Sequence, residues 1–79
     1  MLYEFKTNLS WDKAKEKALS YFKDNLGLEV TDNNEICLTF EGGGGYVKIT
    51  SCIEEDDTRK VEVETREWDR RIKSFMKEF

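Results

Sequence analysis

The stretch FEGGGGYVKIT, residues 40–50, decides between two very different folds. A glycine-rich loop that cradles phosphate follows a strand and opens a helix, so that backbone amides at the start of the helix face the anion. Here the glycines lead into YVKI, residues 46–49, which is typical of a strand. No GK[ST] follows them either. The segment therefore predicts a β-hairpin that binds no phosphate.

A hairpin with residues 42–45 as its loop places the flanking apolar rows on the same side of a sheet, as strand register demands. Glycine suits such a loop because a positive φ costs it little. A loop that accepts the backbone or a carboxylate of a ligand is the alternative role for these glycines. The opposed pairs are then Phe40 with Val47, Leu38 with Ile49, and Ile36 with Ser51.

The segments on either side of this hairpin predict two helices and three more strands. Residues 10–27 predict a helix that Ser10 caps at its start and Gly27 ends. Residues 68–79 carry apolar side chains at three- and four-residue spacing, which predicts a second helix. The further strands are expected at residues 3–7, 28–31 and 61–64. In residues 46–53, Val47, Ile49 and Ile53 are expected to point inward.

Antiparallel strands joined by short turns can bury one apolar face beneath two amphipathic helices. We therefore expect one α+β domain over residues 1–79, a two-layer sandwich in the order β-α-β-β-β-β-α. Its sheet has four or five mainly antiparallel strands, with both helices on one face. The predicted core contains Trp11, Phe22, Phe40, Ile49, Trp68, Ile72 and Phe75.

The element order resembles a shortened helix-grip fold, in which a curved antiparallel sheet wraps a C-terminal helix. Larger members of that fold hold apolar ligands between helix and sheet. The resemblance implies a small apolar ligand as one candidate partner, in a gap between Trp11, Phe22, Trp68 and the sheet.

The composition narrows the range of functions. The chain has 79 residues, of which 17 are acidic and 13 basic, giving a net charge of −4. This balance argues against a nucleic acid or an anionic membrane as partner, because both attract basic proteins. The sequence shows no apolar run of signal-peptide or membrane-spanning length, so we expect a soluble, cytoplasmic protein. Abundant charge without histidine or proline suggests a thermophilic source.

Residue types that carry catalytic chemistry are scarce. Without histidine, the two cysteines make a poor metal site and cannot form a Cys-His pair, and we expect no metal and no cofactor. The acidic run Glu54–Asp57 lacks the spacing of a calcium loop and is expected at a solvated hairpin tip. A weak enzyme is the least favoured hypothesis, because it rests only on Lys15 and scattered carboxylates.

Two surfaces are candidates for binding. The outer sheet face should carry a small-residue centre and one aromatic anchor, inside a charged rim. Small and β-branched residues also suit a sheet without any partner. The members of this expected surface are Cys37, Thr39, Tyr46, Thr50 and Cys52.

The second surface is basic. Arg66, Arg70 and Arg71 lie near the start of the last helix, where cations oppose the helix dipole. Either nearby carboxylates, from Glu64, Glu67 and Asp69, compensate them or they contact an acidic partner. The sequence thus favours a non-catalytic protein-interaction module, a monomer or weak dimer, over a small-ligand binder or an enzyme.

Overall fold

The structure is a computed structural model that describes residues 1–53 and 58–79. The predicted tip at Glu54–Asp57 lies outside the described residues. The elements follow the predicted order, and a π-helical segment, η1, continues the first helix. They are β1 (Leu2–Thr7), α1 (Trp11–Ala18), η1 (Leu19–Asn25), β2 (Glu29–Asn33), β3 (Cys37–Gly42), β4 (Gly45–Ile53), β5 (Arg59–Arg66) and α2 (Asp69–Met76).

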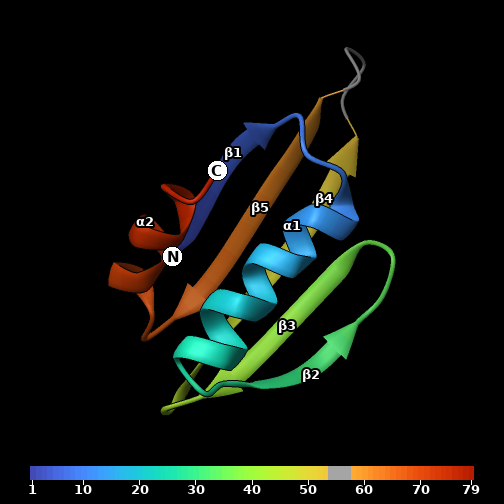
Figure 1. The fold of residues 1–79 in the computed structure, drawn as a ribbon. Helices are drawn as coiled ribbons and strands as arrows, with labels where there is room; N and C mark the ends of the chain where they lie inside the picture. The colour runs from blue at the N-terminus through green and yellow to red at the C-terminus, as the bar shows by residue number, and fades with distance from the viewer. Residues whose placement is uncertain (54–57) are drawn as a thin grey trace.

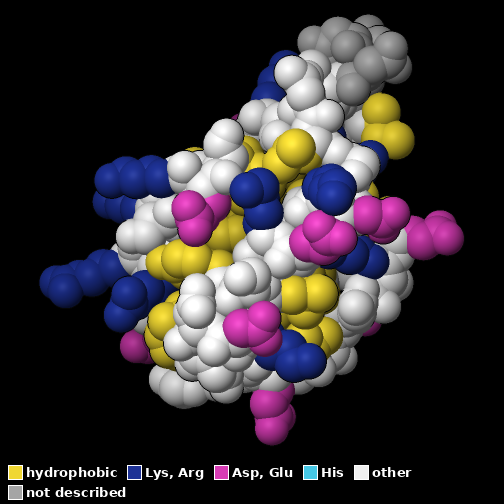
Figure 2. Space-filling model, viewed as in Figure 1, with side chains coloured by type: hydrophobic (Ala, Val, Ile, Leu, Met, Phe, Trp, Pro, Cys, Tyr) yellow, Lys and Arg dark blue, Asp and Glu magenta, His cyan; other side chains and the backbone are white. Residues whose placement is uncertain are grey.

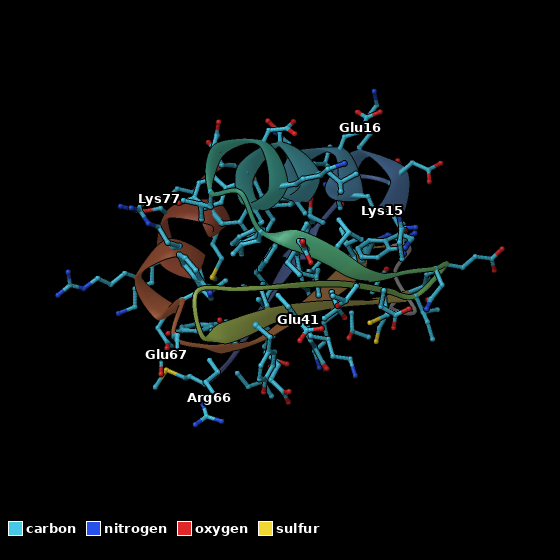
Figure 3. All side chains as sticks on the ribbon, turned by 90° about the horizontal axis from the view of Figure 1, so that it is seen from below. Lys15, Glu16, Glu41, Arg66, Glu67 and Lys77 are labelled. Carbon is cyan, nitrogen blue, oxygen red and sulfur yellow. The ribbon has the colours of Figure 1, made fainter. Side chains whose placement is uncertain are left out.

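The five strands form one antiparallel sheet in the order β1-β5-β4-β3-β2. The first strand therefore lies at one edge, beside the last strand. Figure 1 shows α1 and η1 crossing the sheet, with α2 near β1. Seen from below, α1 and η1 lie on one side of the sheet, and Arg66 points away on the other side (Figure 3). The predicted two-layer α+β fold is confirmed.

The glycine stretch forms the predicted hairpin between β3 and β4. Phe40 pairs with Val47 and Leu38 pairs with Ile49, as expected. The loop is shorter than predicted, because Gly42 and Gly45 pair with each other and leave a two-residue turn. The two turn residues have φ values of 60° and 81°. These values fit a turn whose twist matches that of the flanking strands.

Two isoleucines that were expected to point into the core are exposed instead. Ile36 is 63% exposed and Ile53 is 73% exposed. Ile36 precedes β3, in a turn where the side-chain oxygen of Asn34 accepts hydrogen bonds from the amides of Ile36 and Cys37. Ile53 is the last residue of the long strand β4. The expected inward orientation is therefore wrong for both isoleucines. Alternation along a strand does not ensure that another element packs over the residues at its ends.

The first helix begins and ends at the predicted residues. The Ser10 side chain accepts a hydrogen bond from the amide of Lys13, and Gly27 has a φ of 72°. Between them, the helix changes from α to π at Leu19. The apolar spacing predicted one continuous α-helix, and no local sequence signal marks the change. The π segment places the neighbouring rings of Tyr21 and Phe22 both against Phe75.

The core joins all layers through Phe22, whose side chain is fully buried. Its ring lies 5.2 Å from that of Phe40 in the sheet and 4.9 Å from that of Phe75 in α2, measured between centroids. All seven predicted core residues belong to this cluster, with Trp68 partly buried at its margin.

Replacing Phe22 with Ala should lower the free energy of unfolding by about 3–5 kcal/mol, because a large ring leaves a cavity between two rigid layers. Chemical denaturation measures this loss. Leu19→Ala is the control, since Leu19 is only half-buried and should lose less. A Phe22→Ala loss below about 1 kcal/mol would show that this ring does not hold the layers together.

Candidate functional site

The indole of Trp68 packs directly on the glycine hairpin. The indole Nε1 donates a hydrogen bond to the carbonyl of Gly42 at 3.0 Å. A Cβ atom added to Gly43 would lie 2.6 Å from Cζ2 of the same indole. The ring and the turn therefore touch so closely that no side chain fits between them.

Two more glycines pack closely against neighbouring residues, and at Gly45 the neighbour is backbone that cannot move aside. A Cβ atom on Gly42 would lie 2.6 Å from Cδ2 of Leu28, and one on Gly45 would lie 2.0 Å from the backbone oxygen of Arg66. Among the four hairpin glycines, only Gly44 has open space around an added Cβ atom. Close contacts at Gly42, Gly43 and Gly45, together with the positive φ of Gly44, thus account for a run of glycines longer than a two-residue turn needs.

Gly43→Ala and Gly44→Ala form a matched pair that separates turn strain from the contact with Trp68. Both residues have a positive φ, so each substitution should cost about 1 kcal/mol through the backbone alone. Gly43→Ala should cost about 1–3 kcal/mol more, because it displaces the indole. Thermal or chemical unfolding measures the difference.

A Trp68→Ala background provides the control for this pair. The extra cost of Gly43→Ala should disappear there, since the indole is gone. If both glycine variants lost the same free energy of unfolding in the original background, the close contact between Gly43 and the indole would be contradicted. Gly43→Asn, which turn chemistry alone would permit, should be disfavoured for the same steric reason.

The predicted interaction surface occupies the sheet face opposite the helices. Thr50 lies opposite Cys37 on one side and Glu62 on the other. Thr39 and Thr50 are half-buried, whereas Cys52 is exposed. Cys37 is buried and only 7% exposed, so it can offer little contact area. These side chains therefore give the face a centre of small residues, with a shallow hollow at Thr50 and with Tyr46 farther along β4 near the hairpin.

Tyr46 is held in place by a carboxylate on the neighbouring strand. Its hydroxyl donates a hydrogen bond to Glu64 at 2.9 Å. This bond is the main cause of a raised pKa of Tyr46, with smaller contributions from partial burial and from the negative charge of Glu64, while Arg66 lowers it. Arg66 lies opposite Tyr46 in the β4–β5 pairing.

The pKa of Tyr46 reports directly on this arrangement. Glu64→Gln should lower the pKa, because the charged acceptor that favours the neutral phenol is lost. Arg66→Ala should raise it further, because a cation that favours the phenolate is lost. NMR-detected titration of the tyrosine ring measures both shifts. Shifts of the same sign in the two variants would contradict the geometry.

The three arginines lie on two different elements, one on β5 and two on α2. Arg66 ends β5 and, with Tyr46 and the glycines, lines a shallow hollow on the outer side. Arg70 and Arg71 are exposed on α2, over which basic side chains gather in Figure 2. In Figure 3, Arg66 points away on the outer side and Lys77 lies toward the helices.

Two of the three carboxylates expected to compensate these arginines have other contacts. Glu64 accepts the hydrogen bond from Tyr46, and Asp69 accepts one from the hydroxyl of Tyr3 at 3.0 Å. Partial burial, followed by this hydrogen bond to Asp69, raises the pKa of Tyr3. Within residues 1–53 and 58–79, Arg70 and Arg71 form no ion pair.

The groups on which the alternative functions rested have structural contacts. The Lys15 ammonium donates to the side-chain oxygen of Asn33 at 2.8 Å and lies 5.4 Å from the centroid of the Trp11 ring. Phe22 packs directly on the sheet, in the region where a helix–sheet pocket was expected. In the described part of the chain, no group of three or more His, Cys, Asp or Glu side chains could hold a metal ion.

Two features of the outer face escaped the sequence analysis. Glu64 is diagonal to Tyr46 across β4 and β5, so only the register of that pair could have revealed it. Leu2 is 60% exposed and stands opposite Glu64 on the other side of β5. Its place beside the outer face follows from the position of β1 at the sheet edge, for which the local sequence has no signal.

No protein-family model matches the chain, and no similar sequence is found among curated proteins. Among the described residues, no helix has the length and apolar character that crossing a membrane requires.

Proposed function

We propose that this protein is a small, non-catalytic protein-interaction module that docks a partner on the outer face of its sheet. One observation carries the proposal: the hydroxyl of Tyr46 is fixed by Glu64 at 2.9 Å. A tyrosine that is already oriented loses little conformational entropy on binding, and aromatic anchors dominate the energy of interfaces.

The surroundings of Tyr46 fit a weak contact surface. Thr39 and Thr50 provide a half-buried centre of small side chains, and Lys48 and Glu64 supply a charged rim. Such a polar rim around a less polar centre is the usual anatomy of an interface. With only one large anchor, we expect a transient complex.

An acidic partner is the best match for the arginines. Arg66 lies opposite Tyr46, and Arg70 and Arg71 are exposed without a carboxylate partner in the described residues. Cations without internal partners at a surface favour acidic groups on a binding protein. The remaining alternatives, a small apolar ligand or a weak enzymatic activity, have no comparable support from the packing.

The double variant Thr50→Arg, Tyr46→Ala tests the docking face. It should abolish capture of a binding protein from the source organism, because it adds a bulky charge to the centre and removes the anchor. The melting temperature should change little, since both side chains lie outside the core. Affinity capture followed by mass spectrometry measures the loss.

Ser20→Arg is the matched control, because it adds the same charge at an exposed position of η1 on the helix side. This control should capture as well as the original protein. If the double variant still captures the same protein, the docking surface lies elsewhere. A salt-dependent loss in Arg70→Glu alone would then assign the contact to α2.

A further inference from the structure

β1 forms a regular edge of the sheet, because it pairs only with β5 in the described part of the chain. The amide of Thr65 donates to the carbonyl of Met1, and the amino group of Met1 donates to the carbonyl of Thr65. Hydrogen-bonded and non-hydrogen-bonded pairs alternate along antiparallel strands. Every second residue of β1 therefore directs its N–H and C=O groups to the open edge. These residues are Leu2, Glu4 and Lys6.

The opposite edge of the sheet is protected, whereas the β1 edge is not. The register of β2 shifts between Val30 and Asp32, and an irregular edge strand resists pairing with another chain. The register of β1 runs without a shift over Leu2–Thr7. A shallow, largely apolar hollow lies along β1, lined by Glu4, Phe5, Lys6 and Lys60.

The charges of β1 are poorly matched to the strand beside it. Glu4 stands opposite Glu62, and Lys6 stands opposite Lys60. Lys60 relieves the first pair, since its ammonium lies 3.1 Å from Glu4 and 3.5 Å from Glu62. These carboxylates raise the pKa of Lys60, with the hydrogen bond to Glu4 as the largest cause. Lys6 has a cation opposite and no ion pair within the described residues.

We propose that the edge of β1 binds a second copy of this chain, in an antiparallel, two-fold symmetric pairing centred on Phe5. Two-fold symmetry keeps the outer faces of both sheets on the same side, so residues that pair must come from the same face. The symmetry axis must therefore pass beside a residue and not between two residues. In the register centred on Phe5, Glu4 of each copy faces Lys6 of the other. The register centred on Glu4 would instead oppose the two Glu4 carboxylates.

This dimer does not depend on the proposed docking role of the outer face. It satisfies the open backbone groups of Glu4 and Lys6, because each Glu4–Lys6 pair can exchange both hydrogen bonds. It also brings the two Phe5 rings together at the point where each already packs on Phe79 at 4.8 Å. The ten strands would form one continuous sheet, in which the two outer faces adjoin.

Charge reversal tests both the partner and the register. Sedimentation equilibrium of the original chain should show concentration-dependent dimers. Glu4→Lys and Lys6→Glu should each weaken association roughly tenfold, because two attractive cross-strand pairs become repulsive. The double variant Glu4→Lys, Lys6→Glu should restore association to near the original level. Lys6→Glu is the cleaner single variant, because it also replaces the repulsive pair with Lys60, so the monomer should not lose stability.

Hydrogen exchange gives a second readout that does not rely on substitutions. The amides of Glu4 and Lys6 should become more protected as protein concentration rises, whereas the amide of Phe5, bonded to β5, should be protected throughout. A chain that stays monomeric at millimolar concentration would overturn the proposal. So would a dimer that neither single reversal weakens, or a double variant that does not recover. Protection that arises only when a foreign peptide is added would assign the edge to another protein and also overturn self-pairing.

Discussion

The fold depends on the contact that Phe22 makes with both the sheet and α2. Its fully buried ring meets Phe40 on one side and Phe75 on the other. In a domain of this size each large buried ring supplies a substantial share of the apolar area that holds the elements together. The small residues Ala14 and Ala18, both buried, let the helix approach the sheet closely enough for that contact.

A second constraint acts at the hairpin, where the indole of Trp68 fixes the connection between β5 and α2 by packing on the turn. The chain turns at Glu67, which has a φ of 76°, immediately before the indole bonds to Gly42. Because Gly43 and Gly45 approach Trp68 and Arg66 so closely, the hairpin and this turn hold each other in position. A sequence feature that resembles a phosphate loop thus has a packing role, and it also shapes the hollow beside Arg66.

The two faces of the sheet differ in what they can offer a partner. The inner face is closed by aromatic side chains, while the outer face presents Tyr46 in a fixed orientation. The two edges differ as well, since β2 is irregular and acidic whereas β1 is regular and carries charges of both signs. The two proposals therefore place binding on the exposed side and on one edge of the sheet. In each case the recognising groups are side chains or backbone groups that the fold leaves available.

The sequence by itself determined the features that depend on neighbouring residues. The cap at Ser10, the helix end at Gly27 and the pairing of Phe40 with Val47 all follow from local spacing and backbone preference. The fold class and the apolar core could be predicted for the same reason, because each element must bury one side. Of the candidate site, the outer position of Thr50 could be predicted from strand alternation, but its setting could not.

Only the tertiary structure decided which distant segments meet. Three contacts join residues that are far apart in the chain. They are the pairing of β1 with β5, the hydrogen bond from Tyr46 to Glu64 and the packing of Trp68 on the hairpin. Ile53 is exposed because no other described element packs over the end of its strand. The π-helical segment occurs where two adjacent rings, Tyr21 and Phe22, both pack on Phe75 of α2. Periodicity shows which side of an element is apolar, but it carries no information about which other element covers that side or how far the cover extends.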